Sequence, residues 1–291
     1  MEKLFKGIDV SKWQGEIDWA KVKKSGIQFA MLRCGYGMFS GQHDEYFETN
    51  YKNAKANGIP VGAYHYSYAK SADEAKREAD YCLSLLKGKS FEFPIAFDIE
   101  DKSQQDLPNS TITEIIKTFC ETLENAGHYV SVYANLWWYN NKIDADIPKL
   151  YDAWLAQWSD APTLKGDFGM WQYTSNGSVD GISGRVDMNN AYKNYPNIMK
   201  LNGLNGFKKE IGNPENPKVE FAPRQAISLY NTPLYVSATA EKESATKSGT
   251  YYIYDGIEIS GRYRITSSSD RAGKTPISSN VTGYVNKKDI K

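Results

Sequence analysis

Strand-like and helix-like stretches alternate through the first 200 residues, and this alternation constrains the fold more than any other feature of the sequence. Amphipathic segments separate short apolar or aromatic runs at residues 5–10, 28–34, 61–68, 93–99 and 130–135. Repeated strand, helix, strand units predict parallel strands covered by helices. Five such units in succession favour a closed barrel over a flat sheet.

Two of the intervening helices carry end signals. The first is predicted to open with a capping box at Ser71, with Glu74 three residues later, and to close near Gly88. The second is expected to follow the same design from Thr111 to Gly127.

After residue 135 the strand-like runs follow one another at shorter intervals. Strand-like runs at 153–158, 168–174 and 185–191 are separated by only about ten residues, which barely suffices for a helical crossover. We therefore predict an irregular α/β barrel of the (β/α)5β3 type, a TIM-like barrel whose last three strands have few or no helices.

Composition divides the chain in two. All seven tryptophans precede residue 172, and residues 205–222 are rich in Asn, Gly, Pro and charge, as linkers are. The tail, residues 223–291, contains short strand-like pieces split by turns, which is a small β-barrel pattern. We expect a first domain at 1–204, a linker at 205–222 and an all-β domain at 223–291.

Charge and hydropathy exclude several classes of function. The chain has 35 basic and 35 acidic residues, so we expect no nucleic-acid partner. No apolar run reaches the roughly 18 residues that span a bilayer, and we expect no membrane insertion. The start lacks the apolar stretch of a secretory signal, so we expect synthesis in the cytoplasm without a signal peptide.

Cysteines and histidines show no metal-ligand spacing, and no phosphate loop or dinucleotide fingerprint is present. We expect neither a metal nor a cofactor. Cys34, Cys82 and Cys120 are interpreted as buried thiols rather than a disulfide framework. His65 alternates with two tyrosines along a strand, so it should point away from them as a satisfied structural histidine.

Paired carboxylates carry the strongest chemical signal. Asp98 and Glu100 are two residues apart at the end of an apolar strand, so both should face the barrel interior at its carboxyl-terminal mouth. Two crowded acids cannot both ionise easily, and Glu100 should have a raised pKa and act as a general acid. The alternative is a solvated strand end that leads into an acidic loop.

Two further acids occur at apparent strand ends. Asp9 interrupts a strand that is otherwise apolar, and Asp187 lies in a run at the end of another strand. Taken singly, Asp9 could cap the following turn and Asp187 could pair with Arg185. Together with the first pair they predict a negatively charged pocket.

Aromatic residues surround these strand ends. Flat rings with polar edges suit sugars, whose C–H faces are apolar and whose rims carry hydroxyls. We expect about a third of the following set to contact a ligand and the rest to pack in the core: Tyr64, Tyr66, Tyr133, Trp137, Trp138, Trp158 and Trp171.

Ordered motifs over residues 5–200 resemble the glycoside hydrolase family 25 lysozymes, also called Chalaropsis-type muramidases. They read GIDVSKWQG, GAYHYSY, FDIE, VYAN, WLAQW and WQYTSNGSVDGISGRVDMN. The resemblance implies an N-acetylmuramidase that acts on bacterial peptidoglycan, on an irregular barrel of about eight strands. It assigns the acid/base role to Glu100 and the partner role to Asp98, with Asp9 and Asp187 completing the catalytic set.

The resemblance also implies substrate contacts. It carries them to Tyr64, Gln157 and Trp171, and we add Tyr66, Tyr133 and Trp158 from the aromatic pattern. Tyr66 departs from the Phe that is frequent in relatives and adds a hydroxyl to the pocket.

The tail is similar to a bacterial SH3-type cell-wall-binding domain. A catalytic barrel linked to a wall-binding module is the plan of phage endolysins and autolysins, and we expect an endolysin-like monomer that reaches the wall after release or export. Cleavage is expected to retain the anomeric configuration through the substrate's acetamido group. Alternatives are Asp9 or Asp187 as nucleophile or base, a non-catalytic peptidoglycan-binding protein, a divalent-cation-dependent hydrolase and a chitinase-like enzyme.

Overall fold

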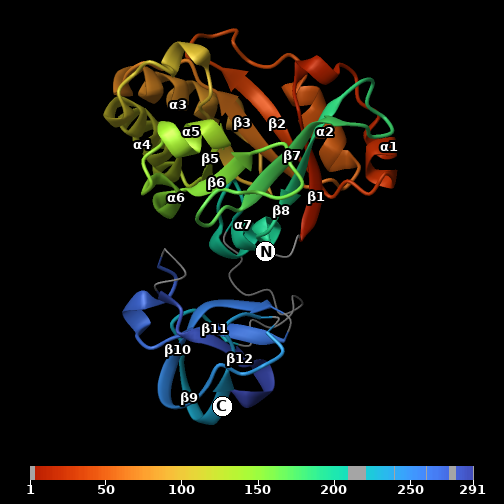
Figure 1. Cartoon of the computed structure of the whole chain (residues 1–291). Helices are drawn as coiled ribbons and strands as arrows, with labels where there is room; N and C mark the ends of the chain where they lie inside the picture. The colour runs from red at the N-terminus through yellow and green to blue at the C-terminus, as the bar shows by residue number, and fades with distance from the viewer. Residues whose placement is uncertain (1–3, 209–220, 239, 260, 275–279, 291) are drawn as a thin grey trace. The chain divides into compact units, whose positions relative to one another are not determined.

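The computed structural model describes residues 4–208, 221–238, 240–259, 261–274 and 280–290 (Figure 1). The chain divides into two compact units, Met1–Ile211 and Gly212–Lys291. Most of the expected linker, at residues 209–220, lies outside the described residues. The predicted domain limits therefore stay a prediction.

Eight strands of the first unit form a closed barrel in chain order, as predicted. Neighbours pair in parallel from the first strand to the seventh, whereas the eighth runs antiparallel to both the seventh and the first. The strands are β1 (Phe5–Val10), β2 (Phe29–Tyr36), β3 (Val61–Tyr66), β4 (Ile95–Asp98), β5 (Val130–Asn135), β6 (Asp152–Ala156), β7 (Met170–Gly177) and β8 (Val186–Ala191).

Helices pack around the outside of the barrel (Figure 1). One or two follow each of the first five strands, and none of the described residues between β6 and β7 is helical. The last helix follows β8. The helices are α1 (Trp19–Lys24), α2 (Phe47–Ala56), α3 (Ala72–Leu86), α4 (Asn109–Asn125), α5 (Leu136–Asn141), α6 (Ile147–Leu150) and α7 (Tyr195–Asn202).

The ends of α3 and α4 follow the predicted cap chemistry in part. The hydroxyl of Ser71 accepts a hydrogen bond from the Glu74 amide at 3.3 Å. The Glu74 carboxylate accepts from the Lys70 amide at 2.7 Å, not from the cap residue itself. The second helix, α4, begins at Asn109 rather than at Thr111. Pro108 precedes it, and its ring holds φ at −56°, which suits the start of a helix. Proline also has no backbone N–H that would need a partner there.

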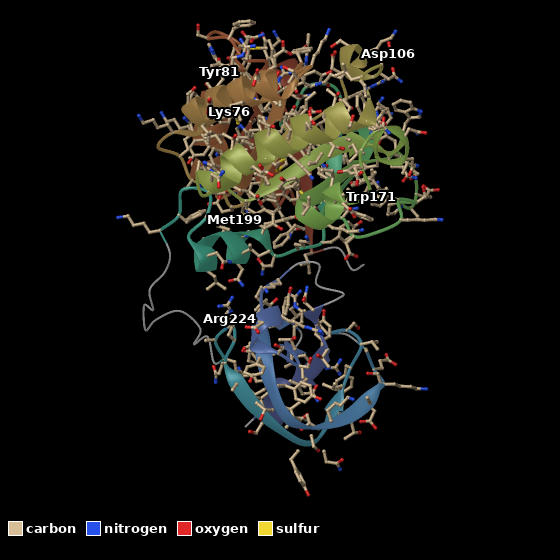
Figure 2. All side chains as sticks on the ribbon, turned by 90° about the vertical axis from the view of Figure 1, so that its left-hand side faces the viewer. Lys76, Tyr81, Asp106, Trp171, Met199 and Arg224 are labelled. Carbon is tan, nitrogen blue, oxygen red and sulfur yellow. The ribbon has the colours of Figure 1, made fainter. Side chains whose placement is uncertain are left out.

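Two apolar layers hold the barrel unit together. The larger lies between the strands and the surrounding helices, and the smaller fills the barrel interior with Phe29, Met31, Phe93 and Trp154 among others. Helix α7 adds Tyr195 and Met199 to the inner layer. Figure 2 shows Met199 at the end of the barrel unit opposite Asp106, which follows β4. The amino-terminal end of the barrel is therefore closed, and a site must lie at the other end.

Asn205, the first residue of the predicted linker, packs into the barrel unit. Its side chain is fully buried, accepts a hydrogen bond from the Tyr129 amide at 2.8 Å and donates to the Phe93 carbonyl at 2.8 Å. Phe207 packs against the inner layer. An Asn- and Gly-rich stretch can supply backbone partners as well as flexibility, and here the barrel unit extends past residue 204.

The second unit is a curled antiparallel sheet in the order β12-β11-β10-β9. A bridge between Tyr235 and Tyr284 brings its two edge strands together. Its core contains Ile227, Ile253 and Val285. The strands are β9 (Ala226–Leu234), β10 (Ala245–Ile259), β11 (Arg262–Thr266) and β12 (Gly283–Asn286). In neither unit is a described helix both long and apolar enough to span a bilayer.

Candidate active site

A pocket of about 180 Å³ opens at the carboxyl-terminal ends of the parallel strands. All four predicted acids line it, together with three of the predicted substrate contacts. The lining residues are Asp9, Val10, Ser11, Trp13, Gln14, Arg33, Tyr64, Tyr66, Asp98, Glu100, Tyr133, Trp154, Gln172 and Asp187.

Strand geometry explains how the acids meet. Asp98 is the last residue of β4 and Glu100 follows two positions later, so the alternation of side chains directs both into the pocket. Asp9 lies near the end of β1. Asp187, which we expected at a strand end, is the second residue of β8. Because β8 runs antiparallel, its start lies at the mouth, and Asp187 pairs directly with Asp9.

Asp9 is held by two side-chain amides. Its Oδ2 accepts from Gln172 Nε2 at 3.0 Å and from Asn189 Nδ2 at 2.7 Å. The orientation of each amide is fixed by a donor on its oxygen, from Trp154 Nε1 to Asn189 at 2.8 Å and from the Tyr133 hydroxyl to Gln172 at 3.2 Å. Trp154 can only donate, so the amide of Asn189 must turn its nitrogen to Asp9.

Burial and crowding favour the protonated form of these acids. Burial raises the pKa of Glu100 to about 7, with further contributions from the charges of Asp187 and Asp101. The pKa of Asp98 lies well above its usual range because of burial and then the charges of Glu100 and Asp9. Burial and the charge of Asp187 likewise raise the pKa of Asp9. A proton donor at neutral pH is what this pocket can supply.

Asp98 has a free acceptor in this setting. Its side chain is 3% exposed, and its Oδ1 has no hydrogen-bond partner among the described residues. The guanidinium of Arg33 also lines the pocket and lowers the pKa of Asp98, against the larger effects of burial and of the other two acids. Arg33 is fixed by Asp44, whose Oδ2 lies 2.8 Å from Nε and from Nη2. A bound molecule with an N–H group could satisfy the open oxygen.

Three predicted substrate contacts line the pocket. Tyr64 and Tyr66 come from alternate positions of β3, and Tyr133 comes from β5. The hydroxyl of Tyr66 donates to Asp101 Oδ2 at 3.0 Å, so it joins β3 to the loop after β4. His65 points the other way, as expected, and is buried outside the pocket.

The other three predicted contacts do not line the pocket. Trp171 packs in the outer apolar layer and donates from Nε1 to the Gln157 carbonyl at 2.8 Å. The side-chain oxygen of Gln157 accepts from Thr163. Trp158 is 65% exposed and donates to Gln172 Oε1 at 3.0 Å, which places it one hydrogen bond from the lining. Their contact with substrate stays a prediction.

The sequence reasoning missed several lining residues. Arg33 is a charge within the buried strand FAMLRCGY, a signal that could have marked it. Trp13 occurs in the first motif and is 77% exposed beside the acids. Gln172 lines the pocket, and Asn189 donates to Asp9 without lining it. Neither carried a signal of its own, because an amide in a strand can also be structural.

Among the described residues, no three of the four acids bring ligand atoms within 4.8 Å of one another. In the part of the chain that the structure describes, the group that brings three ligand atoms within 4.8 Å of one another is Cys34, His65 and Cys82, outside the pocket. A barrel mouth lined by aromatic rings, with crowded carboxyl groups and a glutamic acid whose pKa is raised, is the arrangement of a glycoside-hydrolase site.

Comparison with known proteins agrees with this class. The profile of glycosyl hydrolases family 25 matches residues 8–182, and the chain belongs to that family. Lysozyme M1 of Streptomyces globisporus is 33% identical over 201 residues, which cover 63% of this chain and 66% of the relative. The autolytic lysozyme of Clostridium acetobutylicum is 29% identical over 184 residues, which cover 63% and 54%.

A solved structure gives the same picture. The modular autolysin LytC of Streptococcus pneumoniae, in complex with a synthetic peptidoglycan ligand, matches with a TM-score of 0.58 and 30% identity. The match covers 65% of this chain and 46% of that chain. This chain thus spans somewhat less than two thirds of Lysozyme M1 and about half of the two autolytic enzymes.

Proposed function

We propose that this chain is a peptidoglycan hydrolase, an N-acetylmuramidase that cleaves the β-1,4 bond between N-acetylmuramic acid and N-acetylglucosamine in bacterial cell walls. Membership of family 25, the likeness to two lysozymes and the peptidoglycan ligand of LytC support this substrate. The observation that carries the proposal is Glu100, whose pKa is raised to about 7 by burial in a pocket that three other acids share.

Glu100 acts as the general acid in this proposal. A glycosidic oxygen must be protonated as its bond to the sugar breaks, and an acid with a pKa near the working pH holds and releases a proton efficiently. After the bond has broken, the same group is a carboxylate and takes a proton from the attacking water. The low polarity that raises its pKa also strengthens its hydrogen bond to the leaving oxygen.

Asp98 positions the substrate's 2-acetamido group. Its unpartnered Oδ1 is an acceptor for the acetamido N–H. Asp98 and Glu100 reach the pocket from one segment, so Asp98 is poorly placed to attack the sugar from the face opposite Glu100. The acetamido oxygen is therefore the proposed nucleophile, and the anomeric configuration is retained.

Asp9 and Asp187 contribute negative charge to the pocket in this proposal. Two side-chain amides hold Asp9 in position in the free protein. Asp187 raises the pKa of Glu100. A direct attack by either acid is the alternative mechanism.

Two experiments test the proposal. Glu100→Gln keeps the shape of the side chain and removes the proton, so digestion of purified peptidoglycan should fall by at least about 100-fold while the fold persists. Mass spectrometry of the wild-type digest should show N-acetylmuramic acid at the new reducing ends. N-acetylglucosamine ends, or near-normal digestion by the variant, would contradict the proposal. Proton NMR of fresh product tests the mechanism, because an inverted anomer excludes acetamido participation.

The second unit is proposed to be an SH3-like module that binds the cell wall, with a catalytic domain and a linker before it. A small antiparallel sheet whose edge strands meet at a bridge supports this assignment. The inactive Glu100→Gln chain should sediment with cell-wall sacculi, and removal of residues 212–291 should weaken this binding. Circular dichroism of the shortened chain controls for its folding. Equal sedimentation of the two chains would reject the module's role.

A further inference from the structure

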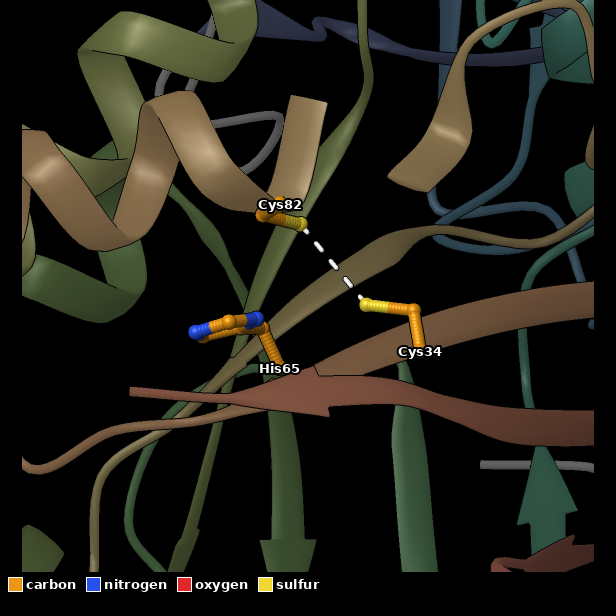
Figure 3. A group of neighbouring side chains, drawn as sticks. All are labelled: Cys34, His65 and Cys82. Carbon is orange, nitrogen blue, oxygen red and sulfur yellow. Dashed lines mark hydrogen bonds between the residues drawn. The ribbon is translucent and has the colours of Figure 1, made fainter. Parts of the chain in front are cut away.

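Three polar side chains meet in the apolar layer outside the barrel (Figure 3). Cys34 comes from β2, His65 from the neighbouring strand β3, and Cys82 from α3, which lies over these strands. All three are 0% exposed. None lines the proposed active-site pocket, so the mechanism gives them no task.

A β-bulge presents Cys34 to the helix. Arg33 pairs with Tyr64 across the β2–β3 ladder and Gly35 pairs with His65, which leaves Cys34 as the extra residue. Arg33 lines the pocket, whereas the Cys34 thiol lies 3.8 Å from the Cys82 thiol on the outer side. The fold thus joins positions that are far apart in the sequence.

His65 carries an open lone pair. Its Nε2 lies 2.9 Å from the Gly37 carbonyl oxygen, which can only accept, so Nε2 bears the proton of a neutral ring. Nδ1 is then an unprotonated acceptor, and it has no hydrogen-bond partner among the described residues. A histidine that binds a metal through one nitrogen usually donates the other N–H to a carbonyl or carboxylate, as His65 does.

The spacing of the ligand atoms fits one shared ion. The two sulfurs and one imidazole nitrogen lie within 4.8 Å of one another. Two sulfurs bonded to one ion at about 2.3 Å with a tetrahedral angle are about 3.8 Å apart. The separation of Cys34 Sγ and Cys82 Sγ has this value.

We propose that Cys34, His65 and Cys82 form a binding site for a thiophilic d¹⁰ metal ion, Zn²⁺ or Cu⁺. Thiolate and imidazole ligands select these ions over Mg²⁺ and Ca²⁺, which prefer oxygen. Zn²⁺ with two thiolates and a neutral imidazole carries no net charge, which suits a site from which water is excluded. Each thiol that binds releases its proton to solvent.

The surroundings favour a cation. Glu78 lies one helical turn before Cys82, is 0% exposed and has an unpartnered Oε2. Because α3 covers the site, the ion would enter as the barrel folds.

The test is refolding of the full chain with defined ions. Reduced, unfolded protein is refolded with one equivalent of Zn²⁺, with one equivalent of Cu⁺ or with a chelator, and is then desalted and analysed for bound metal. We expect about one tightly held ion per chain in at least one metal arm. The thermal midpoint of the barrel, followed by tryptophan fluorescence, should rise by roughly 5 °C or more over the chelator arm.

Cysteine variants locate the ion. Cys34→Ala and Cys82→Ala should each abolish metal retention, whereas Cys120→Ala should keep it, because Cys120 is an equally buried thiol in α4 outside the cluster. If the first two variants do not fold, the wild-type arms still decide. Wild-type protein that folds in every arm but retains less than a tenth of an equivalent, with an unchanged midpoint, would overturn the proposal. Retention by all three variants would overturn it too.

Discussion

Replacing Glu100, the proposed proton donor, should stabilise the barrel in a way that depends on pH. Burial raises the pKa of Glu100 from its ordinary 4.5 to about 7, and each pKa unit corresponds to about 1.4 kcal/mol. The ionised carboxylate therefore costs the folded state about 3 kcal/mol. Glutamine imitates the protonated acid and does not carry this cost.

The sign of the effect follows from the two pKa values. Below pH 4.5 the acid is protonated in both the folded and the unfolded chain, and wild type and Glu100→Gln should differ by a constant amount. Between pH 4.5 and 7 the unfolded chain loses the proton first, so wild type loses stability relative to the variant. Above pH 7 the difference should level off, about 3 kcal/mol higher than at pH 4.

Urea denaturation at pH 4, 6 and 8 measures this difference. All seven tryptophans precede residue 172 and lie in the barrel unit, so their fluorescence reports on that unit and not on the second one. Glu16→Gln, at an exposed glutamate, is the control and should show little pH dependence relative to wild type. A free-energy difference for Glu100→Gln that is the same at all three pH values would refute the raised pKa.

Three further predictions concern the same pocket. Asp187→Asn removes a charge that raises the pKa of Glu100, so the alkaline limb of the kcat/KM profile should move to lower pH, and an unmoved limb would contradict this coupling. Asn189→Ala removes one of the two amide donors of Asp9, and both the free energy of unfolding, by about 1–3 kcal/mol, and the turnover should fall; unchanged values of both would show that the amide is dispensable. Trp13→Ala should raise KM for glycan fragments while the free energy of unfolding changes by less than about 0.5 kcal/mol, because Trp13 is 77% exposed; an unchanged KM would remove Trp13 from the binding surface.

Local periodicity was enough to predict the barrel and the position of its acids. The two-residue repeat of a strand places Asp98 and Glu100 on one side, and an acid within an apolar strand, as at Asp9, marks the inner face near the mouth. The direction of β8 could not be predicted in this way. The direction of a strand depends on the path of the loop before it, and a pattern of alternating residues reads the same in both directions.

Sequence periodicity also did not predict which side chains of β7 face the barrel interior. Trp171 and Gln172 are adjacent, and the structure turns Gln172 into the pocket and Trp171 into the outer layer. Barrel strands are buried on both faces, so the hydropathy of a short strand does not reveal which side is inside. The cluster of Cys34, His65 and Cys82 could not be predicted from the sequence either. The pairing of β2 with β3 and the packing of α3 bring these three residues together.

The reversed direction of β8 also decides where the polypeptide leaves the barrel. Because β8 starts beside the acids and runs antiparallel to its neighbours, it ends at the closed, amino-terminal end of the barrel. There α7 and Asn205 pack against the barrel. The last described residues of the barrel unit, Phe207 among them, therefore lie at the end of the barrel opposite the pocket.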